Sequence, residues 1–316
     1  MTSDDVRAGV TLTNLDQSLF DGASATKRDL VDYLDAVHAH LVGVLRDRPL
    51  SVIRARPGQD PFMQKNLPKS APAWVRRASI WAETSKRQVA YALCNDRRTL
   101  VWFANQRAVE YHPTLVRTGS EDRPTHLVVD IDPPPREGFR LAVAAAGVVR
   151  AALAEAGLTG VVKTSGAKGL HVFVPVAGGP TTEEVAAATR AVAARAERLD
   201  PALATTAFLR EDRGDKVFLD STRTGGATVA AAYSPRVRPG TPVSFPVAWE
   251  DLGEVAPADF TVHNAARLLG GGDPWADGMP EAQALGPDLV EEGRSIPAGR
   301  VQAMHEGKRR ARARRP

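Results

Sequence analysis

Two acidic side chains, Asp130 and Asp132, follow an apolar stretch near the middle of the chain. Residues two apart on a β-strand point to the same face, so these carboxylates are expected side by side. Like charges at short range raise each other's pKa unless a cation lies between them. The spacing therefore predicts a divalent-cation site. Alone, the Asp-x-Asp pattern has a high false-positive rate, because it also caps turns and occurs in glycosyltransferases and phosphatases.

A glycine-rich segment lies between the next two apolar stretches and reads SGAKGLH over residues 165–171. Glycine lets backbone N–H groups approach an anion, while Ser165 offers a hydroxyl and Lys168 and His171 offer charge. A plain hairpin turn would also explain the glycines, but it has no use for these three side chains together. The spacing is not that of a Walker loop. We interpret the segment as a cradle for phosphates.

A third carboxylate, Asp220, ends another apolar stretch and precedes Arg223 by three residues. Carboxylates with few histidines nearby suit Mg²⁺ or Mn²⁺ better than zinc, and two such ions can activate a hydroxyl and stabilise departing pyrophosphate. Arg223 suits a triphosphate, although an Asp–Arg pair so close in sequence is often only a surface salt bridge. His112, before Pro113, is by itself more often structural than functional.

The elements around these residues alternate between strand and helix from Leu127 onward, which is typical of an α/β layer. This order resembles the split β-α-β-β-α-β unit of ferredoxin-like sheets, in which Asp130 and Asp220 converge on one face. The predicted elements are strands at 127–132, 161–164, 169–176, 216–220 and 227–235, and helices at 139–157 and 181–199.

Upstream, the pattern predicts one long helix over 24–49, a strand at 50–56, short strands near 78–81 and 88–92, and a helix entered at Asn95. A short strand before Pro113 follows that helix. After Pro239 the chain is rich in proline and glycine and is expected to wrap the main body with little regular structure. The final thirty or so residues are expected to form an exposed extension.

Composition describes an ordinary globular protein of 316 residues, 43% hydrophobic and 25% charged. The single cysteine, Cys94, excludes an internal disulfide and fits a reducing compartment, so a cytoplasmic location is expected. Neither a signal peptide nor a membrane-spanning stretch is present in the pattern. Six basic residues lie in 308–316, which leaves −2 of the +4 net charge on the remainder. Such a run is expected to be disordered and to attract phosphate polymers, or merely to aid solubility.

Four motifs occur collinearly: EYHP, VVDIDP, SGAKGLHVFVP and FLDSTR. Together they resemble the polymerase domain of bacterial ATP-dependent DNA ligase D, within the archaeo-eukaryotic primase superfamily. The resemblance extends to ATKRDLVDYL, PFMQKNLP, NDRRTLVWFANQ and AAYSPRVRPGTPVSFPVAWEDL, and so spans roughly residues 10–290. It implies an α+β primase-polymerase fold with a ferredoxin-like, RRM-like catalytic sheet and an N-terminal α/β subdomain. One domain over 1–300 is expected, with an N-terminal subdomain at about 10–125, a core at about 126–290 and a tail at 301–316.

The resemblance also implies a template-dependent nucleotidyltransferase that extends primer 3′ ends at gaps and breaks in non-homologous end joining. It implies a preference for Mn²⁺ over Mg²⁺ and for NTP over dNTP. The implied ligands of the two ions are Asp130, Asp132 and Asp220. The implied nucleotide-binding residues are His112, Ser165, Gly166, Lys168, His171, Arg213, Arg223, Arg54 and Lys65. Lys27 is implied in binding the 5′ phosphate across a gap, and Phe62 in binding DNA.

The chain departs from the family at three points. Gln17 replaces a second phosphate-binding lysine, Met63 replaces one of two paired phenylalanines, and no Lys-x-Asp-Gly ligase motif occurs. The first two changes remove a charge-assisted contact and an aromatic platform. The third predicts a stand-alone polymerase that works with a separate ligase. A monomer associated with the nucleoid is also expected, with gapped or broken DNA and an end-binding protein as partners.

Three other functions fit part of the pattern. One is primer synthesis without a pre-existing 3′ end. Another is a DNA-end binding module with a decayed active site, against which the three aspartates argue. The last is a phosphohydrolase or glycosyltransferase using Asp-x-Asp; in the former a Thr or Val would follow the second aspartate, where Pro133 and Pro134 stand.

Overall fold

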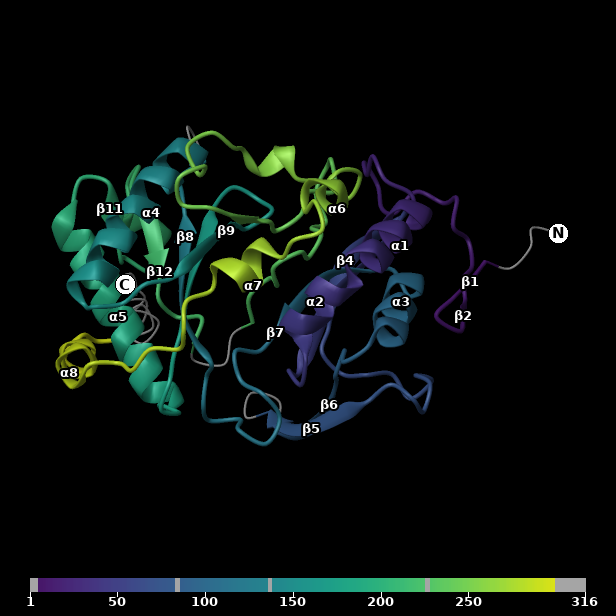
Figure 1. Ribbon diagram of the computed structural model, residues 1–316, viewed down its shortest axis with the longest axis horizontal. Helices are drawn as coiled ribbons and strands as arrows, with labels where there is room; N and C mark the ends of the chain where they lie inside the picture. The colour runs from purple at the N-terminus through teal and green to yellow at the C-terminus, as the bar shows by residue number, and fades with distance from the viewer. Residues whose placement is uncertain (1–4, 83–85, 136–137, 225–227, 299–316) are drawn as a thin grey trace, which may run out of the picture.

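The computed structural model describes residues 5–82, 86–135, 138–224 and 228–298 and divides into two lobes (Figure 1). The N-terminal lobe carries helices α1 to α3 and strands β3 to β7, and the C-terminal lobe carries the sheet of β8 to β13 with helices α4, α5 and α8. The short helix α7 lies between the lobes. No helix in the described part of the chain is long and apolar enough to cross a membrane.

The sheet of the C-terminal lobe has the order β11-β12-β8-β10-β9-β13. Its central strand β8 pairs antiparallel with β10 on one side and β12 on the other. The chain order confirms the predicted β-α-β-β-α-β unit, to which two short edge strands are added. The elements are β8 (His126–Asp132), α4 (Gly138–Glu155), β9 (Val161–Thr164), β10 (Leu170–Pro175), α5 (Thr182–Leu199), β11 (Ala204–Thr205), β12 (Val217–Asp220) and β13 (Pro246–Val247).

The two faces of this sheet differ in chemistry. Leu127, Val129 and Ile131 of β8 pack in the core formed with the alanine-rich helices α4 and α5, where small side chains allow close approach. The alternate residues Val128 and Asp130 therefore face the other lobe. The pleat places the carboxylates away from the helices, as the spacing predicted. The predicted capping box of α5 is also confirmed, with Thr181 at the N-cap and Glu184 three residues later.

The N-terminal lobe corrects one helix prediction. The expected single helix over 24–49 is two helices, α1 (Lys27–Ala36) and α2 (His38–Leu45), separated at Val37, whose ψ is 12°. His38 Nδ1 lies 2.7 Å from the Asp35 carbonyl oxygen and so competes for an acceptor that a continuous helix would use. Thr26 caps α1 together with Asp29.

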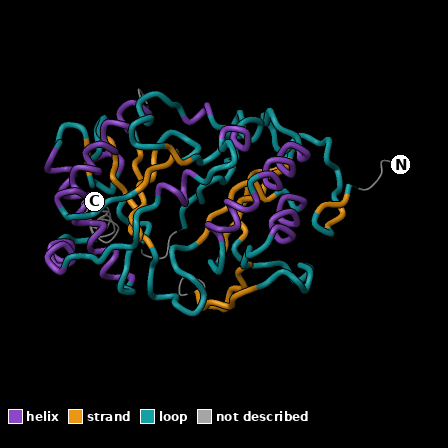
Figure 2. The backbone as a smooth tube through the Cα atoms, viewed as in Figure 1, coloured by secondary structure: helices purple, strands orange, loops and turns teal. Residues whose placement is uncertain are grey.

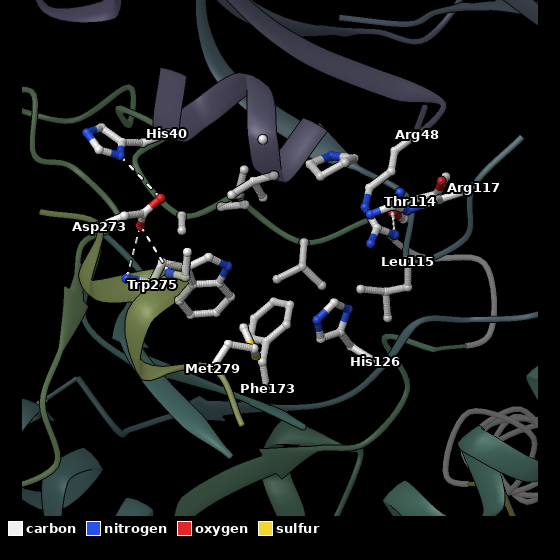
Figure 3. A pocket seen from close by; sticks show the side chains of 18 residues that line it. His40, Arg48, Thr114, Leu115, Arg117, His126, Phe173, Asp273, Trp275 and Met279 are labelled. Carbon is white, nitrogen blue, oxygen red and sulfur yellow. Dashed lines mark hydrogen bonds and ion pairs between the residues drawn. The ribbon is translucent and has the colours of Figure 1, made fainter. Parts of the chain in front are cut away.

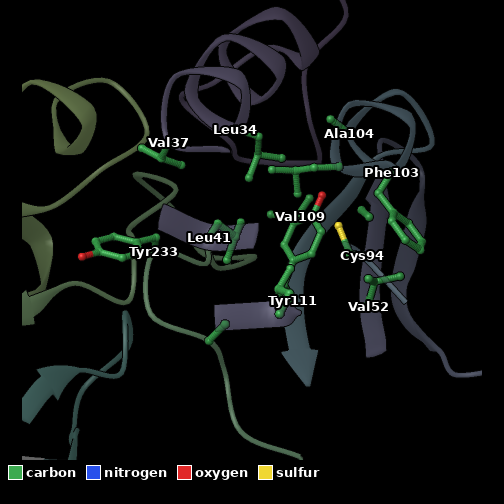
Figure 4. Close-up of a cluster of buried hydrophobic side chains, with 14 of the residues drawn as sticks. Leu34, Val37, Leu41, Val52, Cys94, Phe103, Ala104, Val109, Tyr111 and Tyr233 are labelled. Carbon is green, nitrogen blue, oxygen red and sulfur yellow. The ribbon is translucent and has the colours of Figure 1, made fainter. Parts of the chain in front are cut away.

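A five-stranded sheet follows these helices, with the order β4-β3-β6-β5 and β7 paired to β3 (Figure 2). The helix predicted after Asn95 and the strand predicted before Pro113 are confirmed. Helices and strands share an apolar core that includes Leu41, Cys94, Phe103 and Tyr111 (Figure 4). The elements are β1 (Val6–Arg7), β2 (Val10–Thr11), β3 (Leu50–Arg56), β4 (Gln59–Gln64), β5 (Arg77–Ala82), β6 (Arg87–Ala92), α3 (Arg97–Asn105) and β7 (Ala108–Pro113).

Two predictions for the C-terminal third are wrong. The strand expected at 227–235 begins at a residue outside the described part, and 228–235 is irregular apart from an isolated bridge from Pro235 to Val243. Tyr233 has a φ of 68°, in the left-handed region that a strand cannot contain. Its N–H instead donates to the Ser244 carbonyl.

The last thirty residues are also not a simple extension. Helix α8 (Pro287–Ser295) packs on α5 and buries Leu289 and Val290. Gly293 lies so close to α5 that a Cβ would stand 1.8 Å from the Ala187 carbonyl oxygen. The basic run 308–316 lies outside the described residues. The remaining short elements are η1 (Arg210–Asp212), η2 (Pro257–Asp259), α6 (Ala265–Leu268) and α7 (Pro274–Gly278).

Candidate active site

Four polar side chains form a row across the middle of the C-terminal sheet. In the strand registers, Asp220 of β12 lies opposite Asp130 of β8, Asp130 opposite His171 of β10, and His171 opposite Lys163 of β9. All four are buried, which is uncommon for charged residues unless they are paired. The row faces the N-terminal lobe. The structure therefore brings together Asp130, Asp220 and His171, although 90 residues separate the two aspartates.

Arg223 neutralises the two aspartates. Its guanidinium lies 2.7 Å from Asp130 Oδ2 and 3.0 Å from Asp220 Oδ2. Burial raises the pKa of Asp130, but the combined effect of His171 and Arg223 is larger and lowers this pKa to about 2. Asp220 Oδ1 accepts from the N–H and hydroxyl of Thr222. The Asp–Arg pair is therefore a half-buried bridge between two strands rather than a local surface contact.

Asp132 lies one pleat farther along β8, in register with Phe218. Burial and the neighbouring Asp130 raise the pKa of Asp132. Among the described residues no hydrogen-bond or ion-pair partner contacts its carboxylate, so its oxygens remain available. The guanidinium of Arg213 stacks over the Phe218 ring at 3.5 Å. Burial lowers the pKa of Arg213, and the charges of Asp132 and Asp220 offset part of this effect, so this predicted nucleotide-binding residue feels the carboxylates.

The donor set suits hard divalent cations. Asp130, Asp132 and Asp220 supply carboxylate oxygens, the ligands preferred by Mg²⁺ and Mn²⁺. As the side chains stand, no three His, Cys, Asp or Glu groups in the described part are close enough together to share one ion. The guanidinium of Arg223 instead spans Asp130 and Asp220. Two neighbouring carboxylates need a positive charge between them, and in this structure the guanidinium of Arg223 provides it.

Residues 165–169 form the turn between β9 and β10, and Leu170 and His171 begin β10. Ser165 Oγ accepts from the N–H groups of Ala167 and Gly169, each at 3.2 Å. Gly166 has a φ of 67°, and a Cβ there would lie 2.6 Å from Arg236 Cγ. A Cβ on Gly169 would lie 2.1 Å from the Ile131 carbonyl oxygen. The glycines therefore permit close approach, and Lys168 lies exposed at the tip of the turn, donating to the Pro133 carbonyl.

His112 is linked to this turn through Glu110 and Arg236, two residues that the sequence did not single out. His112 Nε2 lies 2.8 Å from Glu110 Oε2, which also accepts from Arg236 Nε at 2.9 Å. Arg236 in turn donates to the Ser165 carbonyl. Glu110 could have been suspected from its spacing on the same strand face as His112. Nothing in the spacing or the neighbours of Arg236 within its motif indicated a contact with Glu110 or Ser165.

Arg54, Lys65 and Phe62 lie on the N-terminal sheet rather than in the row. Arg54 bonds to the Gln106 carbonyl and to Gln64, and its guanidinium carbon lies 5.5 Å from the centre of the Phe62 ring. Phe62 is 47% exposed. Lys65 is exposed just beyond β4. No hydrogen bond or ion pair between described residues links Arg54 or Lys65 to the carboxylates.

Lys27 is more enclosed than expected for a phosphate ligand. It is 2% exposed, and its ammonium group donates to the Thr13 carbonyl and to Asn105 Oδ1. Burial and the nearby Arg107 lower the pKa of Lys27 to about 8. Arg107, which sequence reasoning missed, donates to Gln17 Oε1 at 2.6 Å. The residue that replaces the family's second lysine thus contacts an arginine.

A largely apolar cavity of about 430 Å³ lies between α2 and the sheet of the C-terminal lobe (Figure 3). Phe173, Trp275 and Met279 line one side, and Arg48 and Arg117 lie at one end. Phe173 is two residues beyond His171 on β10, so the cavity occupies the same face of the sheet. The three carboxylates do not line it.

A family model for the LigD primase-polymerase domain matches residues 26–275. The chain belongs to the LigD primase-polymerase family. Members of this family are DNA-directed nucleotidyltransferases. The described fold agrees, because the solved polymerase domain of Mycobacterium tuberculosis ligase D in complex with DNA superposes with a TM-score of 0.79 at 30% identity. That match covers 87% of this chain and 98% of the solved one.

Full-length LigD proteins are longer than this chain. The bifunctional non-homologous end joining protein LigD of Bacillus subtilis is 32% identical over 271 residues, which cover 84% of this chain and 43% of that protein. The multifunctional non-homologous end joining DNA repair protein LigD of M. tuberculosis is 34% identical over 260 residues, covering 78% and 34%. The chain thus spans less than half of the LigD proteins it matches, and it corresponds to their primase-polymerase part.

Proposed function

We propose that this LigD-type chain extends primer 3′ ends on a DNA template at gaps and broken ends during end joining. The observation that carries the proposal is the row of Asp220, Asp130 and His171 on three adjacent strands, with the Ser165 turn at its edge. The row offers ligands for cations beside a cradle for phosphates. Nucleotidyl transfer needs both at one place.

In the reaction, the primer 3′ oxygen forms a bond to the α-phosphorus of a nucleoside triphosphate, the bond from that phosphorus to the bridging oxygen breaks and pyrophosphate leaves, and the hydroxyl proton passes to solvent water. Asp130, Asp132 and Asp220 would hold two Mn²⁺ or Mg²⁺ ions. Bound there, such ions supply Lewis-acid activation of the hydroxyl and charge neutralisation of the leaving group. Arg223 would then turn from the carboxylates to the triphosphate, where its planar fork can donate to phosphate oxygens.

The Ser165 turn would bind the triphosphate through the hydroxyl of Ser165, the backbone at Gly166 and the charge of Lys168. His171 would donate from the row, and His112 would take part through the Glu110–Arg236 bridge. Arg236 joins the proposed set because its guanidinium already contacts the Ser165 carbonyl. Arg213 supports the set from the Asp132 side. Arg54 and Lys65 would act from the N-terminal lobe, closer to Phe62 and the template.

The 5′ phosphate across a gap would bind at Lys27 and Arg107. Arg107 is half-buried, and its guanidinium donates to Gln17. Its positive charge is therefore more accessible to solvent than that of the buried Lys27. Burial and then the nearby Arg107 lower the pKa of Lys27, and burial and then Arg56 lower the pKa of Arg107. Neighbouring cations that lower each pKa in this way mark a place that favours an anion. Arg107 would thereby replace the charge that Gln17 removes.

The preference for ribonucleotides rests on the family resemblance alone. A separate or linked ligase and an end-binding protein are proposed as partners on the same basis. The solved relative is a complex with DNA, which supports DNA as the substrate of this chain.

The test is single-nucleotide incorporation on gapped DNA, with NTP and dNTP compared at matched concentrations and with or without a 5′ phosphate on the downstream strand. We expect incorporation with Mn²⁺, faster with NTP and stimulated by the phosphate. DNA binding without incorporation under every condition would point to an end-binding module. Triphosphate hydrolysis without DNA would point to a phosphohydrolase.

A further inference from the structure

Lys163 is the one member of the buried row to which the proposed chemistry gives no role. It is fully buried in β9, and in the described part of the chain no carboxylate lies within ion-pair distance of it. Its Nζ lies 2.7 Å from His171 Nδ1 and 2.5 Å from Ser244 Oγ. Burying a lysine is costly, so a side chain that served only to fill this space would be aliphatic.

We propose that Lys163 is a positioning residue that fixes the tautomer of His171, so that the Nε2–H of His171 faces the carboxylates and the incoming triphosphate. The role toward the triphosphate rests on the proposed function. The tautomer itself does not, because it follows from contacts within the chain.

The proton count along the row sets the direction of each hydrogen bond. Ser244 Oγ lies 2.7 Å from the Thr164 carbonyl oxygen, which can only accept, so the single hydroxyl proton of Ser244 is committed there. Ser244 Oγ must therefore accept from Lys163. An ammonium has three N–H bonds and a neutral amine has two, so in either state Lys163 can donate to both Ser244 and His171.

The other end of the row excludes the reverse arrangement. His171 Nε2 lies 3.3 Å from Asp130 Oδ1, while Arg223 contacts the second oxygen of the same carboxylate. Were Nδ1 to carry the proton, the Nε2 lone pair would face a carboxylate oxygen and two acceptors would oppose each other. With the proton on Nε2, every contact in the series Thr164, Ser244, Lys163, His171 and Asp130 joins a donor to an acceptor.

The sheet holds this series in place. His171 pairs in register with both Asp130 and Lys163, so backbone hydrogen bonds fix the spacing of the three side chains. Ser244 comes from the segment after the irregular stretch, and the Phe245 carbonyl accepts from the Thr164 N–H. The wrapping segment thereby anchors the far end of the row. His171 can then meet an anion without first choosing a tautomer, which lowers the cost of ordering on binding.

The direct test is NMR of the full chain labelled with ¹⁵N-histidine, at about pH 7.5, where imidazole is largely neutral. The sequence has seven histidines, and His171→Gln identifies the signal of interest. Long-range couplings from the ring nitrogens to the ring carbon protons distinguish the two tautomers. We expect the Nε2–H tautomer in the wild-type chain. Finding the Nδ1–H tautomer there would overturn the inference, whether or not the chain polymerises and whether or not any variant folds.

Lys163→Met keeps an unbranched side chain that is one atom shorter and removes its donor. We expect the His171 nitrogens to shift toward a mixture of tautomers, with the other histidine signals unchanged, and KM for the triphosphate to rise about tenfold with a smaller change in kcat. Lys163→Gln retains an N–H donor and should recover part of both effects. Ser244→Ala is the matched control, because it leaves the Lys163–His171 contact and should preserve the tautomer.

An unchanged His171 signal in a folded Lys163→Met protein would overturn the inference and leave Lys163 a structural residue only. Equal loss of activity in Lys163→Met, Lys163→Gln and Ser244→Ala would do the same. A wild-type chain that shows the expected tautomer but no incorporation would instead refute the proposed function and leave the Lys163–His171 coupling intact.

Discussion

The buried row of the C-terminal sheet and the basic cluster of the N-terminal lobe differ in how their charges are compensated. In the row, Asp130 and Asp220 share Arg223, and His171 separates Asp130 from Lys163. The basic cluster comprises Lys27, Arg54, Arg56 and Arg107. Among the described residues none of its members has a carboxylate within ion-pair distance.

This difference indicates what each region binds. Burial and neighbouring cations lower the pKa of Lys27, Arg54 and Arg107, so the cluster holds positive charge that nothing in the described chain neutralises. Such a region is ready for an external anion, such as the phosphates of DNA. The row, in contrast, is compensated internally, and under the proposed function it would exchange one cation, Arg223, for divalent metal ions. Affinity for DNA is therefore expected from one lobe and chemistry from the other.

The largest effect is expected from removing a carboxylate of the row. Asp130→Asn should lower single-turnover primer extension by at least about a thousandfold, because a ligand and the partner of Arg223 are lost together. Binding of gapped DNA, measured by fluorescence anisotropy, should change less than about twofold, because the basic cluster is intact. Glu155→Gln, an exposed position on α4, is the control. Normal extension by Asp130→Asn would remove the row from the mechanism.

The bridge between the lobes should be the most sensitive point for stability. Glu110→Gln should lower the free energy of unfolding by about 3 kcal/mol at neutral pH, since Arg236 and His112 lose a buried charged partner. Urea denaturation measures this value, and Glu155→Gln again serves as the control.

The same variant should change the pH dependence of stability. Although burial raises the pKa of Glu110, its partners lower it to about 2, below the ordinary 4.5. A lowered folded-state pKa means that the contribution is complete above the unfolded value and disappears as pH falls toward 2. The difference between wild type and Glu110→Gln should therefore shrink below about pH 4.5. A difference that stays constant with pH would show that Glu110 does not bridge the lobes as a carboxylate.

A smaller effect is expected at the basic cluster. Arg107→Gln should reduce the stimulation of incorporation by a 5′ phosphate about tenfold, because one charge-assisted contact is lost. The slope of log affinity against log salt should fall by about one. Arg140→Gln, an exposed arginine on α4, controls for net charge. Equal stimulation in both variants would place the 5′ phosphate elsewhere.

The smallest effect is expected at Phe62. Phe62→Ala should weaken binding of the template strand by about 1 kcal/mol, near fivefold, at the low end for a base stacked on an aromatic ring. Leu268→Ala removes a similarly exposed apolar side chain from α6 and should leave DNA binding unchanged. An equal loss in both variants would show that the platform on β4 does not contact bases.

Local patterns predicted most of the C-terminal lobe. Alternation along β8 placed Asp130 and Asp132 on one face, and the capping box of α5 was visible in the sequence. One error has a local cause, because the His38 ring contacts the Asp35 carbonyl where the first helix is interrupted at Val37. The other lies where tertiary contacts outweigh local preference: the N–H of Tyr233 donates to the Ser244 carbonyl, and its positive φ rules out a strand there.

Spacing over a few residues was enough to predict the strand and helix faces, the three carboxylates and the glycine turn. The contacts between distant residues became visible only in the folded chain: Lys163 with Ser244, Glu110 with Arg236, and Arg107 with Gln17, pairs separated by 81, 126 and 90 residues. Such pairs leave no local period in the sequence, since they form where independently folded elements meet. The carboxylates predict a cation, and the packed lobes show which side chains contact the carboxylates and the glycine turn.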